Sequence, residues 1–528
     1  MAEKKKENIF KDFHYSKVLR VSAKTLSKDR LLINLLPKLK FKGRVPVTIG
    51  ALTDFNAVYD AVFNSDNFID FNHNPSLIKE WLKDNVMDVL NRGNREKEKF
   101  VSLKPFTLNA YKASNRDNKR DYGISDQIYA LLSAADAKEE NPDNRIINKL
   151  LKFLTHGYES LEDKVHIGKD MELLEAVVTS IVNDIERDRT DEDRTLAQAE
   201  EAICIGQANL LKEDLSNILE YETVMPKGAI LKALVQLMFL HTGIYVLKVA
   251  KLLPDIVDNN GFPECCKQCQ QSSCPYEIKF QLDFASAFSS EIARLSQRSA
   301  EYHERILILY IEKQYYLRNL ADFLGDFEII NKDNYKLKDI FVELSDKEKL
   351  SRDAYFISRI NEYIKVTEEE VTFNYEENAL EKFISIINEK YNGFYFNFLK
   401  RLISSLFSKN EADALLYQTG QYKKYGLGNE LLDTLINVAS LDTVNGEKRS
   451  RMLRVDEFID WLKKRYGFYI SESMFKVNDI AVLQGLRRNE QLFRERLQSI
   501  GYYSPTSDAY YTQWIVPRYE LKGGPQNE

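Results

Sequence analysis

The sequence predicts a mainly α-helical protein of several domains that ends in a winged-helix-like module. Tyrosine and phenylalanine each occur 29 times, against 21 glycines and 12 prolines, which favours large cores and few turns. Apolar residues recur at helical spacing through most of the chain. Residues 429–521 differ from the rest, because three helical patterns are followed there by two short apolar runs.

The helical patterns and the polar segments between them predict three domains. The longest helix is expected within 283–324, with further helices at 77–90, 229–253, 355–364 and 379–407, and a short strand at 371–375. Polar or glycine-containing runs at 112–123 and 423–428 predict boundaries. We therefore expect a basic N-terminal helical region (1–120), a central helical domain (121–425) with a cysteine-rich loop (254–275), and the winged-helix-like module (426–528).

The segment 229–253 is the most hydrophobic helix candidate. It contains Lys232, His241 and Lys248, which are costly at the centre of a bilayer, so a buried core helix is expected and not a membrane span. The start of the chain is polar, and no apolar stretch typical of a signal peptide follows it. Five cysteines without an export signal favour a reducing compartment. A cytoplasmic protein is expected.

Charge is distributed unevenly along the chain. Residues 1–50 carry 13 Lys and Arg against 4 Asp and Glu, and residues 446–500 carry 12 against 8, although the net charge is -6. Two basic ends around an acidic middle are typical of a protein with a nucleic-acid or acidic-protein partner. Exposed helix faces that differ in sign would give the same distribution.

The predicted C-terminal module has the element order of a winged helix. The third helix, where a recognition helix would lie, carries four arginines: Arg487, Arg488, Arg494 and Arg496. Aromatic residues follow at 502–514, and arginines beside aromatics suit phosphate pairing and base stacking. These arginines are the candidate nucleic-acid-binding residues, with DNA as the candidate ligand. Docking of another protein is the alternative, because winged helices serve both purposes.

Four of the five cysteines fall within ten residues and predict a zinc site. They are Cys265, Cys266, Cys269 and Cys274. The spacing from Cys266 to Cys269 lets two thiolates meet one Zn²⁺, and Cys274 and Cys265 would complete the set. Adjacent cysteines cannot both point inward without strain, so His241 or His303 is an alternative to Cys265. An iron–sulfur cluster or ordinary thiols remain open, and Cys204 is expected in a core.

Motifs of known enzyme classes are absent from the sequence. It contains no phosphate-binding loop, dinucleotide fingerprint, nucleophile elbow or His-Glu-x-x-His pattern. One pattern fits the spacing of metal-dependent nucleases, in which Asp255 and Glu277 would hold Mg²⁺ and Lys279 would steady the attacking water. A divergent nuclease is therefore the alternative function.

Four short stretches near the C-terminus carry a family resemblance. They are Gly-Asn-Glu-Leu-Leu (428–432), Leu-Arg-Val-Asp-Glu-Phe-Ile-Asp-Trp-Leu (453–462), Arg-Tyr-Gly (465–467) and Ser-Asp-Ala-Tyr (507–510). In these the chain resembles helical accessory proteins of multi-gene bacterial anti-phage defence systems, which act beside a motor or nuclease. The resemblance implies a subunit of a defence complex and supplies no active-site residue. With the missing motifs, it predicts a non-enzymatic scaffold or adaptor in a nucleic-acid-directed complex with other proteins.

Overall fold

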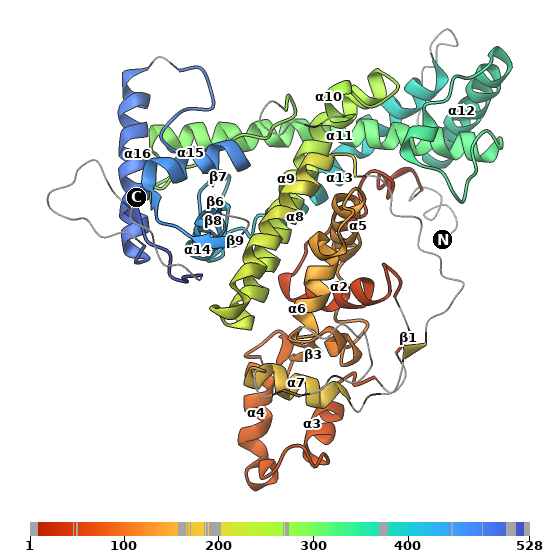
Figure 1. Cartoon of the computed structure of the whole chain (residues 1–528). Helices are drawn as coiled ribbons and strands as arrows, with labels where there is room; N and C mark the ends of the chain where they lie inside the picture. The colour runs from red at the N-terminus through yellow and green to blue at the C-terminus, as the bar shows by residue number, and fades with distance from the viewer. Residues whose placement is uncertain are drawn as a thin grey trace.

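The computed structural model confirms a mainly helical protein, and most of its described buried apolar side chains belong to one continuous core. It describes residues 9–45, 47–48, 51–94, 96–156, 165, 167–168, 171–183, 185, 188–189, 202–267, 269, 274–368, 378–444, 447–477, 479–502 and 514–521. Figure 1 shows the long helix α11 (Glu291–Asp326) running between the C-terminal elements and α12 (Asp346–Thr367), with the N-terminal elements on the other side of α9 (Lys227–Asp258). The strand expected at 371–375 lies outside the described residues.

The N-terminal part consists of short helices and one hairpin. Its helices are α2 (Leu31–Lys40), α3 (Phe55–Phe63), α4 (Pro75–Asn85), α5 (Ile124–Asp136), α6 (Ile146–Leu154) and α7 (Leu173–Asn183). Strands β2 (Met87–Leu90) and β3 (Lys99–Leu103) pair antiparallel, as do β1 (Val47–Thr48) and β4 (Asp188–Arg189). Helices α2 and α5 pack together, and α5 packs on α8 (Ile205–Leu219).

The central part is organised around α9, the helix predicted at 229–253. It packs against α8, α11 and α13 (Ala379–Leu406). Although α9 is long and apolar enough to cross a membrane, its most apolar window is 89% buried, as in the core helix of a globular protein. The other elements here are α10 (Glu264–Lys267), β5 (Phe280–Gln281) and the hairpin of β6 (Leu416–Thr419) with β7 (Tyr422–Tyr425). Strand β7 therefore occupies the first half of the segment expected as a hinge at 423–428.

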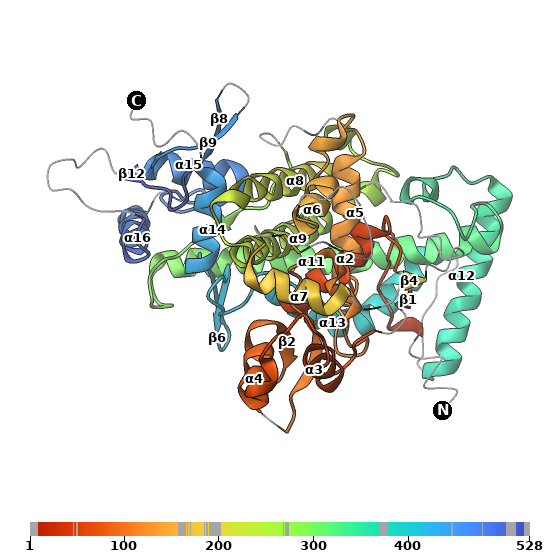
Figure 2. The ribbon, with the colours of Figure 1, turned by 60° about the horizontal axis from the view of Figure 1, so that its bottom comes forward.

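The C-terminal part contains the three predicted helices in the predicted order. They are α14 (Asn429–Ala439), α15 (Val455–Tyr466) and α16 (Ile480–Ser499). Helix α15 has acidic residues in its first turn and basic residues in its last, which suits the helix dipole. A hairpin of β8 (Leu441–Val444) and β9 (Glu447–Ser450) projects from this part (Figure 2).

The two strands expected after the third helix are only partly described. Strand β12 (Trp514–Ile515) pairs antiparallel with β10 (Leu453–Arg454), directly before α15. Residues 503–513 lie outside the described part, so the wing stays a prediction. The short strand expected at 468–470 is present as β11 (Phe468–Tyr469), and it pairs in parallel with β5 of the central part.

Candidate functional site

Three adjoining pockets form a groove where the N-terminal, central and C-terminal parts meet. We call them the outer, middle and inner pockets, with cavity volumes of about 850, 430 and 330 Å³, and together the junction groove. The outer and middle pockets share Lys28, Asp29 and Glu411. The middle and inner pockets share Lys232, Gln236 and Glu430. Because neighbouring pockets share walls, they form one groove, whose middle and inner pockets lie along the first turns of α9. Junctions of this kind are common ligand sites.

Both signs of charge line the groove, and most of these charges are paired. Lys28 binds Glu411 at 2.9 Å and also contacts Asp413. Lys232 lies 2.7 Å from Glu430, and Arg518 lies 2.7 Å from Asp433. In the outer pocket, Glu304 forms ion pairs with Lys400 and Lys423. The groove is therefore polar without a strong surplus of either sign.

Asp88 on β2 is the most perturbed carboxyl group of the groove. Burial, together with the nearby charge of Asp29, raises its pKa to about 7, although Lys104 and Arg92 act against this shift. Burial also lowers the pKa of Lys104, which lines the same middle pocket. Among the described residues, the Asp88 carboxylate forms no hydrogen bond and no ion pair. The neighbouring cations Arg92 and Lys104 bind Asp84 instead. A perturbed acid and base that share a pocket mark a candidate binding site.

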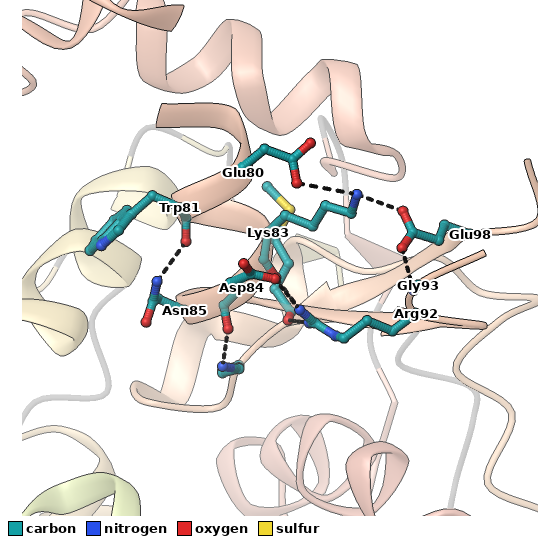
Figure 3. A network of polar contacts seen from close by, with 10 residues as sticks. Glu80, Trp81, Lys83, Asp84, Asn85, Arg92, Gly93 and Glu98 are labelled. Carbon is teal, nitrogen blue, oxygen red and sulfur yellow. Dashed lines mark hydrogen bonds and ion pairs between the residues drawn. The ribbon is translucent and has the colours of Figure 1, made fainter. Parts of the chain in front are cut away.

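The end of α4 fixes the hairpin that carries Asp88 (Figure 3). Arg92 binds the Asp84 carboxylate at 2.6 Å and donates to the Lys83 and Met87 carbonyls at 3.0 and 3.1 Å. Lys104 donates to the Asp84 carbonyl at 2.9 Å. A cation at the C-terminal end of a helix satisfies carbonyls that lack partners within the helix. These contacts hold β2, and with it Asp88, in place.

The predicted cysteine site has an unexpected neighbour in Cys204, the residue before α8. Its pKa is raised by burial and, further, by the charges of Cys269 and Cys274, so it does not lie alone. The backbone N–H of Gly206 donates to the Cys269 sulfur. Cys265 is exposed, and Cys266, Cys269 and Cys274 are half-buried. Burial and the adjacent Cys265 raise the pKa of Cys266 to about 12, so this thiol is protonated at neutral pH without a metal.

The histidines considered as zinc ligands face other partners. His241 is hydrogen-bonded to Gln207 through Nδ1 and to Asp214 through Nε2. His303 Nδ1 is hydrogen-bonded to the Tyr425 hydroxyl. Within the described ranges, no three His, Cys, Asp or Glu side chains gather closely enough to hold a metal ion. The zinc site therefore stays a prediction for Cys265, Cys266, Cys269 and Cys274.

Zinc binding has a direct test. If the cysteines bind Zn²⁺, elemental analysis of protein purified without chelators should find one zinc per chain, and its affinity should fall as pH drops, because the thiols must lose protons. Cys266→Ser should remove the zinc and loosen residues 254–275 locally in hydrogen exchange. Cys204→Ser is the informative comparison, since this buried thiol was not among the predicted ligands. Protein with no metal and four titratable thiols in the folded state would contradict the site.

The candidate nuclease residues all lie near Lys251, but each of them already interacts with another side chain. The Asp255 carboxylate accepts a hydrogen bond from the Tyr276 hydroxyl at 2.6 Å. Glu277 lies 3.6 Å from Lys279. Lys251 interacts electrostatically with all three residues. The nuclease alternative stays a prediction, because in the part of the chain that the structure describes neither carboxylate lies together with two further possible metal ligands.

The four arginines of α16 do not form a single surface. Arg494 lies 2.7 Å from Glu490 and Arg488 lies 3.5 Å from Glu495, both on the same helix. Arg496 donates to the Asn429 side chain at 2.8 Å. Arg487 and Arg488 are exposed, whereas Arg494 and Arg496 are half-buried. Binding to phosphates would therefore rest mainly on Arg487 and Arg488.

Nucleic-acid binding by α16 would show in its salt dependence. If Arg487 and Arg488 contact phosphates, affinity for a DNA duplex should fall steeply with salt, and Arg487→Gln with Arg488→Gln should flatten that slope by about two counterions. Fluorescence anisotropy over a salt series measures both effects. Lys448→Gln with Arg449→Gln, on the projecting hairpin, is the matched control of equal charge loss. Binding that ignores salt, or no binding to DNA, would favour protein docking.

The stretches that carry the family resemblance join the C-terminal part to the core. Arg465 Nε donates to the Asp214 carboxylate at 2.9 Å, and the Tyr466 hydroxyl donates to it at 2.5 Å. His241 Nε2 lies 2.8 Å from the same carboxylate, which is fully buried. The next residue, Gly467, accepts a hydrogen bond from the Phe280 N–H at 2.8 Å. We call Asp214, His241, Arg465 and Tyr466 the junction clamp.

Other residues of the stretches that carry the family resemblance pack in the core. Leu431 and Leu432 of α14 and Phe458, Ile459 and Leu462 of α15 are buried. The residues 507–510 lie outside the described part. The sequence analysis missed the junction clamp, although one signal was present: Asp214 lies on the apolar face formed by Leu211, Leu215 and Ile218. A charged residue on such a face indicates a buried partner.

Comparison with known proteins agrees with the resemblance. The family model for "Methylation-associated defense system protein MAD7" matches residues 8–519. No curated protein and no solved structure matches the chain. The family model spans nearly the whole sequence, including the groove, the cysteine loop and the clamp. The chain therefore belongs to the family of methylation-associated defense system protein MAD7.

Proposed function

We propose that this defence-system protein is a non-enzymatic scaffold that holds other subunits of a nucleic-acid-directed complex. The observation that supports the proposal is the junction groove, whose walls come from all three parts of the chain. A surface assembled from distant segments and fixed by buried polar contacts is preorganised, so a partner does not have to order it on binding. The continuous core beneath it supplies that rigidity.

The membership of a defence system supplies the class of partner. Its other protein subunits are the candidates, and nucleic acid would be reached through them or through α16. The protein would act in the cytoplasm, where such a complex meets phage DNA. Nothing in this role needs a metal, so zinc in the cysteine loop would be structural.

Reconstitution tests the scaffold. The other proteins of the same defence system are co-expressed with or without this chain and analysed by size-exclusion chromatography. Wild-type chain should bring at least two of them into one peak that separates in its absence. If the others assemble equally well without it, or if none binds it, the scaffold proposal is wrong.

A cleavage assay tests the alternative. Purified protein is incubated with plasmid DNA and Mg²⁺ or Mn²⁺, and a scaffold should leave the plasmid intact. Glu277→Ala is the diagnostic variant, because Glu277 is a candidate metal ligand. Cutting by the wild type that disappears in this variant would replace the scaffold by a nuclease.

A further inference from the structure

We infer that the junction groove binds an extended segment of a partner protein, and that the middle pocket receives a lysine or arginine side chain of that segment. This inference rests on the proposed scaffold function and names the chemistry of its partner. Three properties of the described residues support it: the shape of the groove, the unpaired carboxylates of the middle pocket, and the unpaired cations of the outer pocket.

The shape of the groove suits an extended chain. Three pockets that share walls in sequence form an elongated site, and the outer pocket alone is larger than the other two together. Polar side chains line the inner pocket: Gln236 and Thr434 are hydrogen-bonded to each other, and the Asn437 side-chain oxygen, which has no partner among the described residues, offers an acceptor to a peptide N–H. An extended peptide needs such partners along its length.

The middle pocket is built for an organic cation with an aliphatic stem. Of its five carboxylates, Glu411, Asp413 and Glu430 already have lysine partners. Asp29 and Asp88 form no ion pair among the residues that the structure describes, although the Lys104 ammonium, which lines the same pocket, lowers the pKa of Asp88 from a longer distance. Beside them lie apolar side chains: Leu32, Pro105, Phe106, Leu231 and Val235. A lysine or arginine would lay its methylene chain on these and place its charge near Asp29 and Asp88.

The outer pocket favours an acidic residue on the same segment. Arg401 and Lys409 line it and are exposed. Across the described residues no carboxylate lies within ion-pair distance of either, although the other basic residues of this pocket are paired with Glu304, Glu411 or Asp413. The groove thus offers a positive end and a negative middle.

The presence of both signs of charge along the groove favours a peptide over nucleic acid as the ligand. A phosphate chain carries one sign of charge, so a groove for it needs a continuous surplus of basic residues. Asp29 and Asp88 at the centre of the junction groove would repel such a chain. A protein segment can instead match both signs, and electrostatic complementarity of that kind selects one partner over others.

The test uses the full-length chain and overlapping fluorescent peptides that cover the other proteins of the same defence system. One peptide should bind, and replacing its lysine or arginine by glutamine should weaken binding about tenfold or more, as expected for a charge-assisted contact. Asp88→Asn should weaken binding by a similar factor. Combining both changes should cost little more than either alone, because they remove the same contact.

Two variants keep the result interpretable. Asp88→Asn should fold, since the raised pKa of Asp88 shows that its charge is disfavoured in the folded protein. If Asp88→Asn does not fold, Asp29→Asn tests the same pocket, since Asp29 lies at an exposed position there. Asp60→Asn, on the exposed face of α3, is the control and should leave affinity unchanged.

The outcomes separate this inference from the scaffold proposal. If subunits assemble on the chain but no peptide binds, or if a bound peptide ignores Asp29 and Asp88, the inference is wrong and the scaffold stands. If no subunit assembles, the scaffold proposal itself fails.

Discussion

Gly467→Ala is expected to destabilise the protein by about 3 kcal/mol or more, from the sum of backbone strain and steric overlap. Gly467 ends α15 with φ of +72°, in the left-handed region that favours glycine. An added Cβ would lie 2.1 Å from the Ile278 carbonyl oxygen, which is backbone and cannot rotate away. Urea-induced unfolding followed by circular dichroism measures the effect.

Gly93→Ala is the matched control for this substitution. Gly93 has a similar φ of +86°, but nothing lies within 4 Å of an added Cβ. Only backbone strain should remain there, at about 1 kcal/mol. If the two variants lose equal stability, the close approach of Gly467 to residue 278 is not what makes glycine necessary.

Asp214→Ala should cost about 3–5 kcal/mol, because it removes the fully buried anion that compensates the half-buried Arg465. Arg465 would lose its main partner, and the buried Tyr466 hydroxyl and His241 ring would each lose a hydrogen bond. The free energy of unfolding from urea titration measures this loss. Asp456→Asn, which breaks only the exposed pair with Arg454, is the control and should cost at most about 1 kcal/mol.

Because of the Asp214 carboxylate, the protein should lose stability in acid. Burial acts to raise the pKa of Asp214, but Arg465 and the hydrogen bond from His241 outweigh it, so the pKa is lowered. A lowered folded-state pKa contributes stability above the unfolded-state pKa of about 3.9 and loses it as pH falls through the folded value. The difference in unfolding free energy between wild type and Asp214→Ala should therefore shrink at the acidic end of a pH series. A difference that is constant down to the lowest accessible pH would contradict the role of the charge.

Most of the helices were predictable because their apolar spacing is strong. The core helix at 229–253 appears as α9, and the long helix at 283–324 appears as α11, which begins eight residues later than predicted. The helix predicted at 77–90 was partly wrong, because α4 ends at Asn85 and residues 87–90 form strand β2. Lys232 and His241, noticed as unsuitable for a bilayer, have polar partners: Glu430 for the first, and Gln207 and Asp214 for the second. In these helices, local pattern and tertiary packing agree.

The junction groove was not predictable, because its residues come from separate segments. Asp29 and Asp88 lie far apart in the sequence and share a pocket with Glu430 only in the folded chain. A single sequence contains no periodic signal for such a meeting. For the arginines of α16, the sequence predicted a binding surface that the structure only partly provides. Arg494 and Arg488 form ion pairs with Glu490 and Glu495 on the same helix.

The junction clamp also bears on how the chain folds during its synthesis. Asp214 and Arg465 are separated by 251 residues, so the central helices leave the ribosome long before their buried carboxylate meets its arginine. Until then the Asp214 carboxylate has only His241 of the junction clamp as a partner, and β5 lacks its neighbouring strand β11. Contacts between such distant segments form slowly, and the unfinished chain exposes apolar surface meanwhile. Early termination upstream of residue 465 should therefore yield a chain that depends on chaperones and is readily degraded.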